Sequence, residues 1–183
     1  MADLTWKILS STYVHRGPWA TLRLDRCAMP DGKIVPGYYV LEYPDWANAV
    51  AVTEDNKILI VTQYRHAAGI ISTEIPGGVV DDNEQPIDAV KRELLEETGY
   101  RFDNIELLAT VHANPSTANN VTHLYLARAG KKVAGQTLDE HEELTVQELS
   151  IAEVKQLLLE NKIKQSLHCT ALFYALMKLG ELG

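Results

Sequence analysis

The sequence predicts an α+β fold in which a mixed β-sheet is covered by helices on both faces. Three observations predict it: strand-like segments open the chain, one helical segment follows a glycine-rich turn in the middle, and two helical segments close the chain. Elements with one apolar face become stable when they pack in layers, and this order of elements suits a sheet between two helical layers. No internal repeat, low-complexity tract or flexible linker interrupts the order.

The first part of the chain reads as an antiparallel meander. The expected strands are Trp6–Val14, Trp19–Ala28 and Lys33–Tyr43. Residues 16–18 and 30–32 separate them, and their Gly, Pro and Asp residues are typical of turns.

A hairpin is expected next. Asn48–Thr53 and Lys57–Tyr64 flank the polar residues 54–56, which suit a tight connection. The second strand contains the continuous apolar run Ile58–Val61, so we expect it to be buried on both faces.

A helix is predicted over residues 86–98. Pro86 fits the first helical turn, where its missing N–H costs nothing, and Gly99 fits the position just past the end. Apolar residues at three- and four-residue spacing form one stripe for the core: Ile87, Val90 and Leu94.

The remaining elements follow the same two periodicities. In order they are strands at Ile105–Ala113 and Val121–Ala127, an acidic loop around 137–143, a strand at Leu144–Leu149, and helices at Ile151–Glu160 and Gln165–Leu179. In the last helix, leucines and alanines stand at core spacing, which indicates packing and not chemistry.

The bulk composition is that of an ordinary globular protein. A chain of 183 residues with 46% hydrophobic and 23% charged residues suits one core, burying about 70% of the extended chain's surface. No apolar run is long enough to span a bilayer, and no basic-then-apolar segment opens the sequence, so we expect a cytoplasmic protein.

Charge and cysteine content exclude several classes. The net charge of -8 repels nucleic-acid polymers and anionic membranes, so an anionic substrate would be small and met by local cations. Cys27 and Cys169 are far apart and form no CxxC pair, so we expect reduced thiols and neither a disulfide framework nor a structural zinc site.

The predicted central helix carries acids that repel each other. Glu93, Glu96 and Glu97 lie three and four residues apart near its C-terminus, where negative charge also opposes the helix dipole. A hard divalent cation would reverse both effects, because Mg²⁺ prefers carboxylate oxygens. A solvated acidic helix face, with Arg92 paired to Glu96, is the alternative interpretation.

These acids belong to a longer pattern of fixed spacing. The pattern runs Gly78, five residues, Glu84, seven residues, then Arg92-Glu93-Leu94-Leu95-Glu96-Glu97-Thr98-Gly99-Tyr100. At average residue usage an arbitrary start position fits with a chance of roughly one in 10⁸. The stretch resembles the signature of the Nudix hydrolases, which cleave a nucleoside diphosphate linked to another group using Mg²⁺ and water. The resemblance implies an α/β/α sandwich with a mixed sheet over residues 46–183.

The resemblance also implies roles for the residues of the motif. Glu93 and Glu97 match the principal Mg²⁺ ligands, with the carbonyl of Gly77 and the carboxylate of Glu96 completing the set, and Mn²⁺ is the alternative ion. Arg92 is placed in the catalytic set with Glu96, as the group that orients the carboxylates. Glu84 is expected to anchor the loop that carries Gly78, and Gly99 to end the helix.

A general base is expected outside the motif, because its glutamates are committed to metal. By resemblance to ADP-ribose pyrophosphatases, a glutamate on a mobile loop activates water, and Glu140 and Glu142 are the matches. His141 between them is a further candidate. A solvated charge run is the alternative interpretation of the loop.

The first 45 residues indicate a subgroup. Such an N-terminal strand region resembles that of the ADP-ribose and nucleoside-diphosphate-sugar pyrophosphatases, in which it forms a homodimer whose subunits complete each other's sites. Gln63–Arg65, Glu74–Gly78 and Pro115 also resemble that subgroup. The loop Asn114–Asn120 departs from it, because the subgroup often has a glycine turn and a ligand acid there.

Residues outside the motif are candidates for substrate contacts. By resemblance to the subgroup, Arg65 is expected to bind a substrate phosphate with its planar fork, and a surface ion pair is the alternative. Glu74 is expected either to bind substrate or to structure the turn. Trp19 is the candidate for stacking on the base, with core or dimer interface as the alternative, and Pro115 completes the substrate set.

The predicted function is Mg²⁺-dependent hydrolysis of ADP-ribose or another nucleoside diphosphate sugar, such as GDP-mannose, to a nucleoside monophosphate and a sugar phosphate. The alternatives are hydrolysis of oxidised or ordinary nucleoside triphosphates, and a Nudix module that only binds a nucleotide. The isomerase branch of the fold would need a cysteine near the site, and Cys27 and Cys169 lie outside every segment expected to line it.

Overall fold

The computed structural model describes residues 3–182 and divides into two compact units. The first unit is Met1–Pro44 with His112–Asn120, and the second is Asp45–Val111 with Val121–Gly183. None of the helices in the described range is long and apolar enough to cross a membrane.

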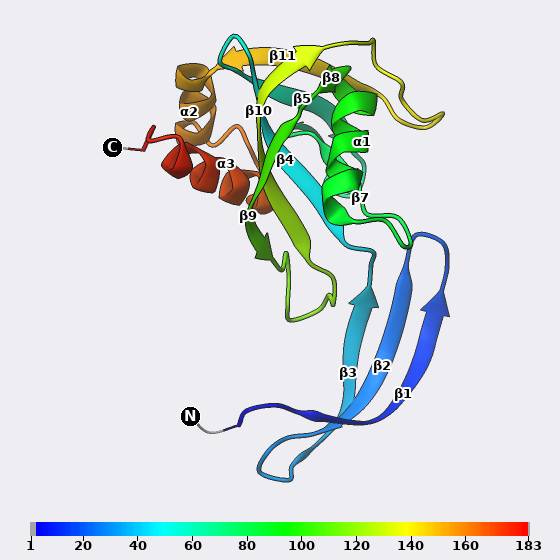
Figure 1. The fold of residues 1–183 in the computed structure, drawn as a ribbon. Coiled ribbons are helices and arrows are strands. Elements are labelled where there is room, and N and C mark those ends of the chain that lie inside the picture. The colour runs from blue at the N-terminus through cyan, green and yellow to red at the C-terminus, as the bar shows by residue number, and fades with distance from the viewer. Residues whose placement is uncertain (1–2, 183) are drawn as a thin grey trace. The chain divides into compact units, whose positions relative to one another are not determined.

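The first unit is built on a three-stranded antiparallel sheet, drawn in blue in Figure 1. Its strands, in the order β1-β2-β3, are β1 (Lys7–Arg16), β2 (Thr21–Ala28) and β3 (Ile34–Glu42). The predicted antiparallel meander is therefore confirmed. Every residue of β1 is exposed, so one edge of this sheet has no covering element within the described chain.

Residues 112–120 join the first unit through hydrogen bonds to β3. Thr117 O accepts from the Leu41 N–H at 2.7 Å, and the Asn119 N–H donates back to Leu41 O at 3.2 Å. The Tyr38 hydroxyl donates to Ser116 O at 2.6 Å. A loop far along the chain is thus fixed to the N-terminal sheet.

The second unit contains a mixed sheet of eight strands. They are β4 (Trp46–Thr53), β5 (Lys57–Arg65), β6 (Ile70–Glu74), β7 (Gly77–Val79), β8 (Tyr100–Arg101), β9 (Asn104–Val111), β10 (Thr122–Lys132) and β11 (Leu144–Ser150). The order β11-β5-β4-β10-β8 forms the main path, with β6 on β5, β7 on β4 and β9 on β10. Strands β4 and β10 pair in parallel and the other pairs are antiparallel, which makes the sheet mixed.

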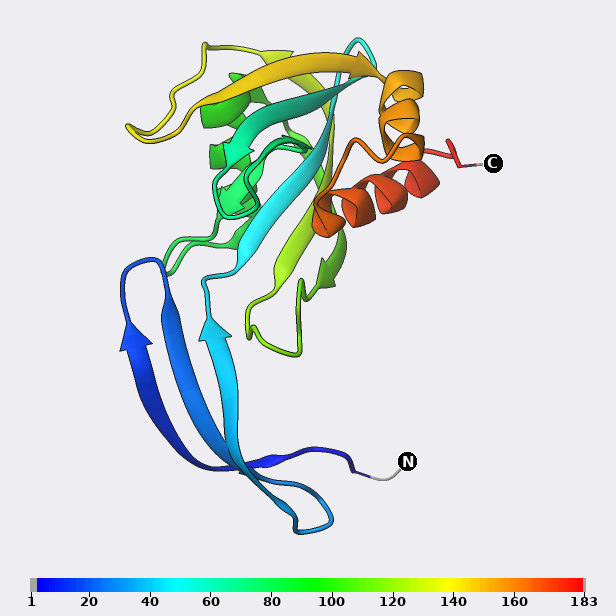
Figure 2. The same ribbon diagram turned by 180° about the vertical axis from the view of Figure 1, so that it is seen from behind.

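Helices cover both faces of this sheet (Figures 1 and 2). Helix α1 (Pro86–Thr98) lies on one side, and α2 (Ile151–Leu159) and α3 (Ser166–Lys178) lie on the other. Successive residues of a strand face opposite sides, and β4 and β5 therefore feed two cores. The predicted α/β/α sandwich is confirmed.

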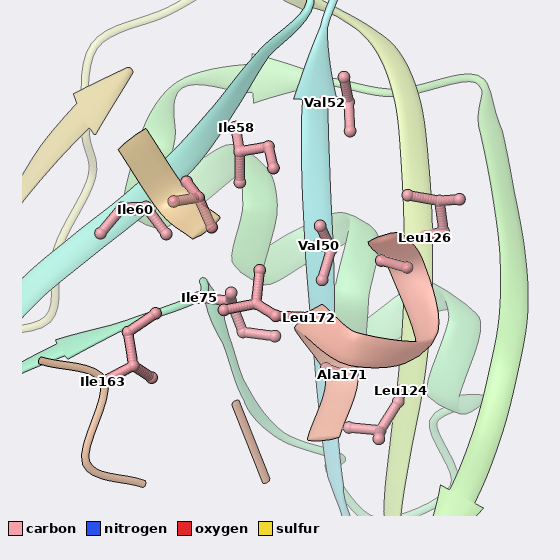
Figure 3. Packing of buried hydrophobic residues seen from close by; sticks show 12 residues of the cluster. Val50, Val52, Ile58, Ile60, Ile75, Leu124, Leu126, Ile163, Ala171 and Leu172 are labelled. Carbon is pink, nitrogen blue, oxygen red and sulfur yellow. The ribbon is translucent and has the colours of Figure 1, made fainter. Parts of the chain in front are cut away.

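Alternate residues of the central strands belong to different cores. The core beneath α2 and α3 includes Val50, Val52, Ile58, Ile60, Leu124, Leu126, Ala171 and Leu172 (Figure 3). The core beneath α1 includes Ala47, Ala49, Ala51, Leu59, Val90, Leu94, Tyr125 and Ala127. The run Ile58–Val61 is completely buried, as its continuous apolar character predicts.

The predicted and observed elements differ in three short strands. Helix α1 has the predicted bounds, although Ile87 is exposed and Ala89 takes its place in the core. Strands β6, β7 and β8 were not predicted. They have five, three and two residues, and pairing with longer neighbours defines them more than their own sequence does.

Candidate active site

The acidic end of α1 is fixed by its last residues. Gly99 adopts φ 74°, and its N–H donates to Leu95 O at 2.9 Å, as in a glycine that ends a helix. A Cβ at this position would lie 2.2 Å from Ala134 O. Glycine is therefore required here both by the backbone conformation and by the close approach of the following chain.

The buried acid of this helix meets the glycine turn. Glu97 is 2% exposed, and one of its carboxylate oxygens accepts a 2.8 Å hydrogen bond from the Gly77 N–H. Gly77 has φ 141°, and a Cβ there would lie 2.3 Å from Ala47 O and 2.6 Å from Asn48 Cα. The turn thus runs so close to β4 that only glycine fits.

The second glycine of the turn makes room for a second acid. A Cβ on Gly78 would lie 2.3 Å from Oε1 of Glu93. The two glycines therefore let the backbone approach Glu97 and Glu93 directly. The support role of Gly78 stays a prediction.

The surroundings of Glu93 and Glu97 disfavour the ionised form of their carboxyl groups. Burial raises the pKa of Glu97 to about 8, and the charges of Glu93 and Glu142 add to the rise, while the Gly77 N–H and Arg65 oppose it. Burial likewise raises the pKa of Glu93, against the lowering effect of Arg92. A bound cation would stabilise the ionised carboxylates.

Arg92 is the local counter-charge. Its guanidinium donates to Glu84 through Nε at 3.1 Å and Nη2 at 3.0 Å, and Nη1 donates to Glu93 at 2.8 Å and Glu96 at 3.2 Å. It also donates to Val79 O at 3.0 Å. Arg92 therefore links the loop before α1 to its acidic face, and its orienting role stays a prediction.

Glu84 fixes the loop at its other end. Besides its pair with Arg92, it accepts a 3.1 Å hydrogen bond from the Asp81 N–H. The hydrogen bonds from Arg92 lower the pKa of the Glu84 carboxyl, more than burial raises it. Glu84 thus contacts both the loop that follows Gly78 and Arg92 of α1, and its anchoring role stays a prediction.

The donor set suits a hard divalent cation. Glu93, Glu96 and Glu97 offer carboxylate oxygens, which such ions prefer as ligands. The raised pKa of Glu97 means that its ionised form is disfavoured, and a nearby positive charge would stabilise that form. Within residues 3–182 no group of three acidic, histidine or cysteine side chains stands gathered as a metal site. Nη1 of Arg92 donates to Glu93 and Glu96, and the Gly77 N–H donates to Glu97.

Arg65 and Glu74 form a second feature of the site. Nε and Nη2 of Arg65 donate to the two carboxylate oxygens of Glu74 at 2.9 and 2.6 Å. Burial would raise the pKa of Glu74, but the contacts with Arg65, His168 and Ser72 lower it below its usual value. The Glu74 side chain is 1% exposed whereas that of Arg65 is 48% exposed. Only Arg65 is therefore able to reach a ligand in solution.

A pocket of about 790 Å³ opens beside Arg65. It is lined by Thr62, Gln63, Tyr64, Arg65, Ile71, Asp139, His141, Glu142, Glu143, Leu144 and Thr145. Strands β5, β6 and β11 supply its walls together with the acidic loop before β11. The acidic loop therefore lines the same pocket as the positively charged Arg65 side chain.

Within that loop Glu142 interacts electrostatically with two acids of α1. Burial is the largest cause of the raised pKa values of Glu93 and Glu97, and the charge of Glu142 adds to both. Glu142 is partly buried and lines the pocket. Glu140 is exposed and is not one of the pocket's lining residues, whereas His141 lines it.

Gln136 holds the base of this loop and was missed by sequence reasoning. Its amide donates to Glu97 O at 2.8 Å and to Leu144 O at 3.4 Å, so it joins the end of α1 to the start of β11. The adjacent Thr137 N–H donates to Glu96 O at 2.8 Å. A single glutamine in a polar loop carries no signal that would have revealed these contacts.

His168 is the second residue that sequence reasoning missed. It is 2% exposed on the buried side of α3, beside residues that the core spacing did identify. A histidine between Leu167 and the core positions 171 and 172 is the one signal that the sequence offered.

Trp19 and Pro115, the other substrate candidates, both belong to the first unit. Trp19 is 89% exposed and Pro115 is also exposed. Their assigned contacts with substrate stay predictions. Cys27 is buried and Cys169 is partly buried, and both are free cysteines.

Comparison with known proteins identifies the family. Residues 43–170 match the model of the NUDIX domain. Residues 6–41 match the model of the nucleoside diphosphate sugar hydrolase N-terminal domain. The two matches fall on the acidic-helix region and on the N-terminal strands, respectively.

Individual relatives agree with these matches. The chain is 31% identical to a methanol dehydrogenase activator from Bacillus methanolicus over 92% of this chain and 91% of the relative. It is 32% identical to an ADP-ribose pyrophosphatase from Mycobacterium tuberculosis over 91% of this chain and 81% of the relative. A crystal structure of an ADP compounds hydrolase shares the fold, with a TM-score of 0.85 at 20% identity over 100% of both chains. The chain therefore belongs to the Nudix hydrolase family and carries the N-terminal domain of the nucleoside diphosphate sugar hydrolases.

Proposed function

We propose that this protein hydrolyses the pyrophosphate bond of ADP-ribose or another nucleoside diphosphate sugar, such as GDP-mannose, and that it needs Mg²⁺ to do so. The products would be a nucleoside monophosphate and a sugar phosphate. The observation that carries the proposal is the buried Glu97 beside Glu93, next to a pocket bordered by Arg65 and Glu142. The relative named ADP-ribose pyrophosphatase, similar along nearly the whole chain, supports the choice of substrate.

The metal requirement rests on the donor set. Nudix hydrolases generally need a divalent metal, and Glu93, Glu96, Glu97 and the Gly77 carbonyl are the proposed ligands, with Mn²⁺ as the alternative to Mg²⁺. When bound, a divalent ion would supply positive charge for the diphosphate oxygens and would acidify a water. Arg92 would keep its bidentate contact with Glu84, and its contacts with Glu93 and Glu96 would give way to the ion.

The chain's own residues account for the other needs of the reaction. Arg65 binds a non-bridging phosphate oxygen at the pocket, where its charge balances the diphosphate. Glu142 accepts the proton of the attacking water as the new phosphorus–oxygen bond forms. The bond from phosphorus to the bridging oxygen breaks, and that oxygen leaves on the other phosphate. Glu140 and His141 are the alternative bases on the same loop.

A substrate panel tests the proposal. Purified protein with millimolar MgCl₂ should convert ADP-ribose to AMP and ribose 5-phosphate, and EDTA should stop the reaction. GDP-mannose and an oxidised nucleoside triphosphate complete the panel. Glu97→Gln is the matched inactive control, because it keeps the side chain's shape and its acceptor for the Gly77 N–H.

The alternatives give different products. A nucleoside triphosphate hydrolase would release pyrophosphate, which sugar-nucleotide cleavage does not. A module that only binds nucleotides would retain ADP-ribose in calorimetry but turn over no member of the panel. Either result would replace the proposal.

We also propose that the protein is a homodimer formed through its N-terminal strands. The fully exposed edge strand β1 supports this, because a long unpaired edge is a template for strand pairing. Its apolar side chains Ile8 and Val14 are 54% and 56% exposed. Light scattering should give twice the chain mass, and a lysine at Val14 should lower it toward one chain. Location in the cytoplasm stays a prediction.

A further inference from the structure

His168 makes a hydrogen bond that fixes its proton. Its Nδ1 lies 3.1 Å from the backbone N of Ile75, in a buried position on α3. The Ile75 N–H is a donor, so Nδ1 must be the acceptor and the ring proton must sit on Nε2. The imidazole thus presents one N–H on its other side.

On that side lies the carboxylate that contacts Arg65. Nε2 of His168 lies 3.5 Å from Oε2 of Glu74. The same Oε2 accepts from Nη2 of Arg65 at 2.6 Å, and Oε1 accepts from Nε of Arg65 at 2.9 Å. His168, Glu74 and Arg65 therefore form one chain of polar contacts from the core to the pocket.

The exposure of the three side chains changes along this chain. His168 and Glu74 are 3% and 1% exposed, whereas Arg65 is 48% exposed. Both contacts of Arg65 with Glu74 use Nε and Nη2, which leaves the Nη1 edge for an anion in the pocket. An arginine has many rotamers, so a fixed carboxylate behind it reduces the entropy lost when it binds a phosphate.

We propose that His168 is a positioning residue for substrate binding, which orients the Glu74 carboxylate so that Glu74 holds the Arg65 guanidinium toward the substrate phosphate. This inference rests on the proposed function, because it needs a phosphate-bearing substrate at Arg65. It assigns a role in the site to a residue of the core helix.

Two substitutions separate the contacts of His168. In His168→Asn the amide oxygen takes the place of Nδ1 and accepts from the Ile75 N–H, but nothing reaches Glu74. In His168→Gln the longer amide reaches Glu74, but the acceptor for Ile75 is displaced. If the contact with Glu74 matters, His168→Asn raises KM for ADP-ribose about tenfold, with kcat changed less, and His168→Gln raises KM less.

Stability is measured in parallel by thermal unfolding. Leu176→Ala is the matched control, because Leu176 is completely buried on the same helix, two turns from His168. It should lower Tm without raising KM. A KM that follows Tm across the three variants would mean that His168 only supports the fold, and would overturn the inference.

A double-mutant cycle with Arg65→Gln identifies the route. Once Arg65 is gone, its orientation no longer matters, so adding His168→Asn should change kcat/KM by less than about twofold. A tenfold loss that persists undiminished in the Arg65→Gln background would overturn the inference. Failure of the proposed function is a different result, namely no ADP-ribose hydrolysis by the unaltered protein.

Discussion

The Gly77 N–H donates a 2.8 Å hydrogen bond to the buried carboxylate of Glu97. This contact joins the first residue of β7 to the last turn of α1, and the two residues are 20 positions apart in the sequence. Because a Cβ at Gly77 would lie 2.3 Å from Ala47 O, the position of the amide is set by β4. The sheet thereby places the acid.

Replacement of Gly77 by alanine should therefore disrupt the site. The added Cβ meets backbone atoms of β4, and φ 141° is unfavourable for alanine, so β7 must shift away from Glu97. We expect a stability loss of about 2–4 kcal/mol in urea unfolding and loss of most activity. Gly180→Ala is the control, because Gly180 also has a positive φ of 74° but its Cβ would meet nothing within 4 Å. Equal effects of the two substitutions would contradict the explanation.

Glu97→Gln should abolish activity yet stabilise the metal-free protein at neutral pH. Loss of this proposed metal ligand removes stabilisation of the charge in the transition state, and we expect kcat to fall by at least about a hundredfold. The pKa of Glu97 is raised from 4.5 to about 8, so the native state binds more protons than the unfolded state between these values. The stability that protonated Glu97 contributes is complete below pH 4.5 and is lost as pH rises through 8.

The measurement is urea unfolding in EDTA at several pH values. The unfolding free energy of the unaltered protein, minus that of Glu97→Gln, should fall by roughly 2–4 kcal/mol from pH 5 to pH 8. Mg²⁺ should restore the stability of the unaltered protein at pH 8 and leave the variant unchanged. A difference that does not change with pH would show that the pKa of Glu97 is not raised in the native state.

The two glutamates of the acidic loop should differ in importance. Glu142 interacts electrostatically with Glu93 and Glu97 and lines the pocket, whereas Glu140 is exposed. We expect Glu142→Gln to lower kcat about a hundredfold, as loss of a general base does, and Glu140→Gln to change it less than twofold. Metal affinity, followed by Mn²⁺ titration, should remain within a few-fold for both. The opposite order of effects would transfer the role of base to Glu140.

Local signals explain what could be predicted from the sequence. Helix α1 has the predicted bounds because Pro86 and Gly99 act within the helix itself. Strand β7 was missed because its glycines have little strand preference of their own. Its pairing with Ala47 and Asn48 is a contact between distant residues.

The same distinction applies to the site. The spacing of Glu93, Glu96 and Glu97 is visible in one helix, so their shared face could be predicted. The choice between Glu140 and Glu142 depends on how a loop folds over that helix, which no local pattern determines. His168 was hidden by its own surroundings, since a residue among core leucines reads as packing.

Gln136 should matter for turnover and not for the fold of the helix. Its amide joins Glu97 O to Leu144 O, so it closes the base of the loop that carries Glu142. Gln136→Ala frees that loop, and we expect kcat to fall about tenfold with KM and Tm little changed. Gln136→Glu, which cannot donate to either carbonyl, should behave like the alanine variant. Full activity of Gln136→Glu would contradict the positioning role.

Acid should destabilise the protein through His168. Burial lowers the pKa of His168 to about 4, with Arg65 adding to the effect and Glu74 opposing it, whereas the unfolded side chain titrates near 6.5. Between these values the unfolded state binds the additional proton, so this contribution to stability is present above pH 6.5 and is lost as pH falls through 4.

The unfolding free energy of the unaltered protein, minus that of His168→Asn, should therefore fall by about 3 kcal/mol from pH 7 to pH 4. Urea unfolding measures it, with Leu176→Ala as the control, because this buried side chain on the same helix carries no titratable group. A pH-independent difference for His168→Asn would mean that the native state does not lower the pKa of the buried imidazole.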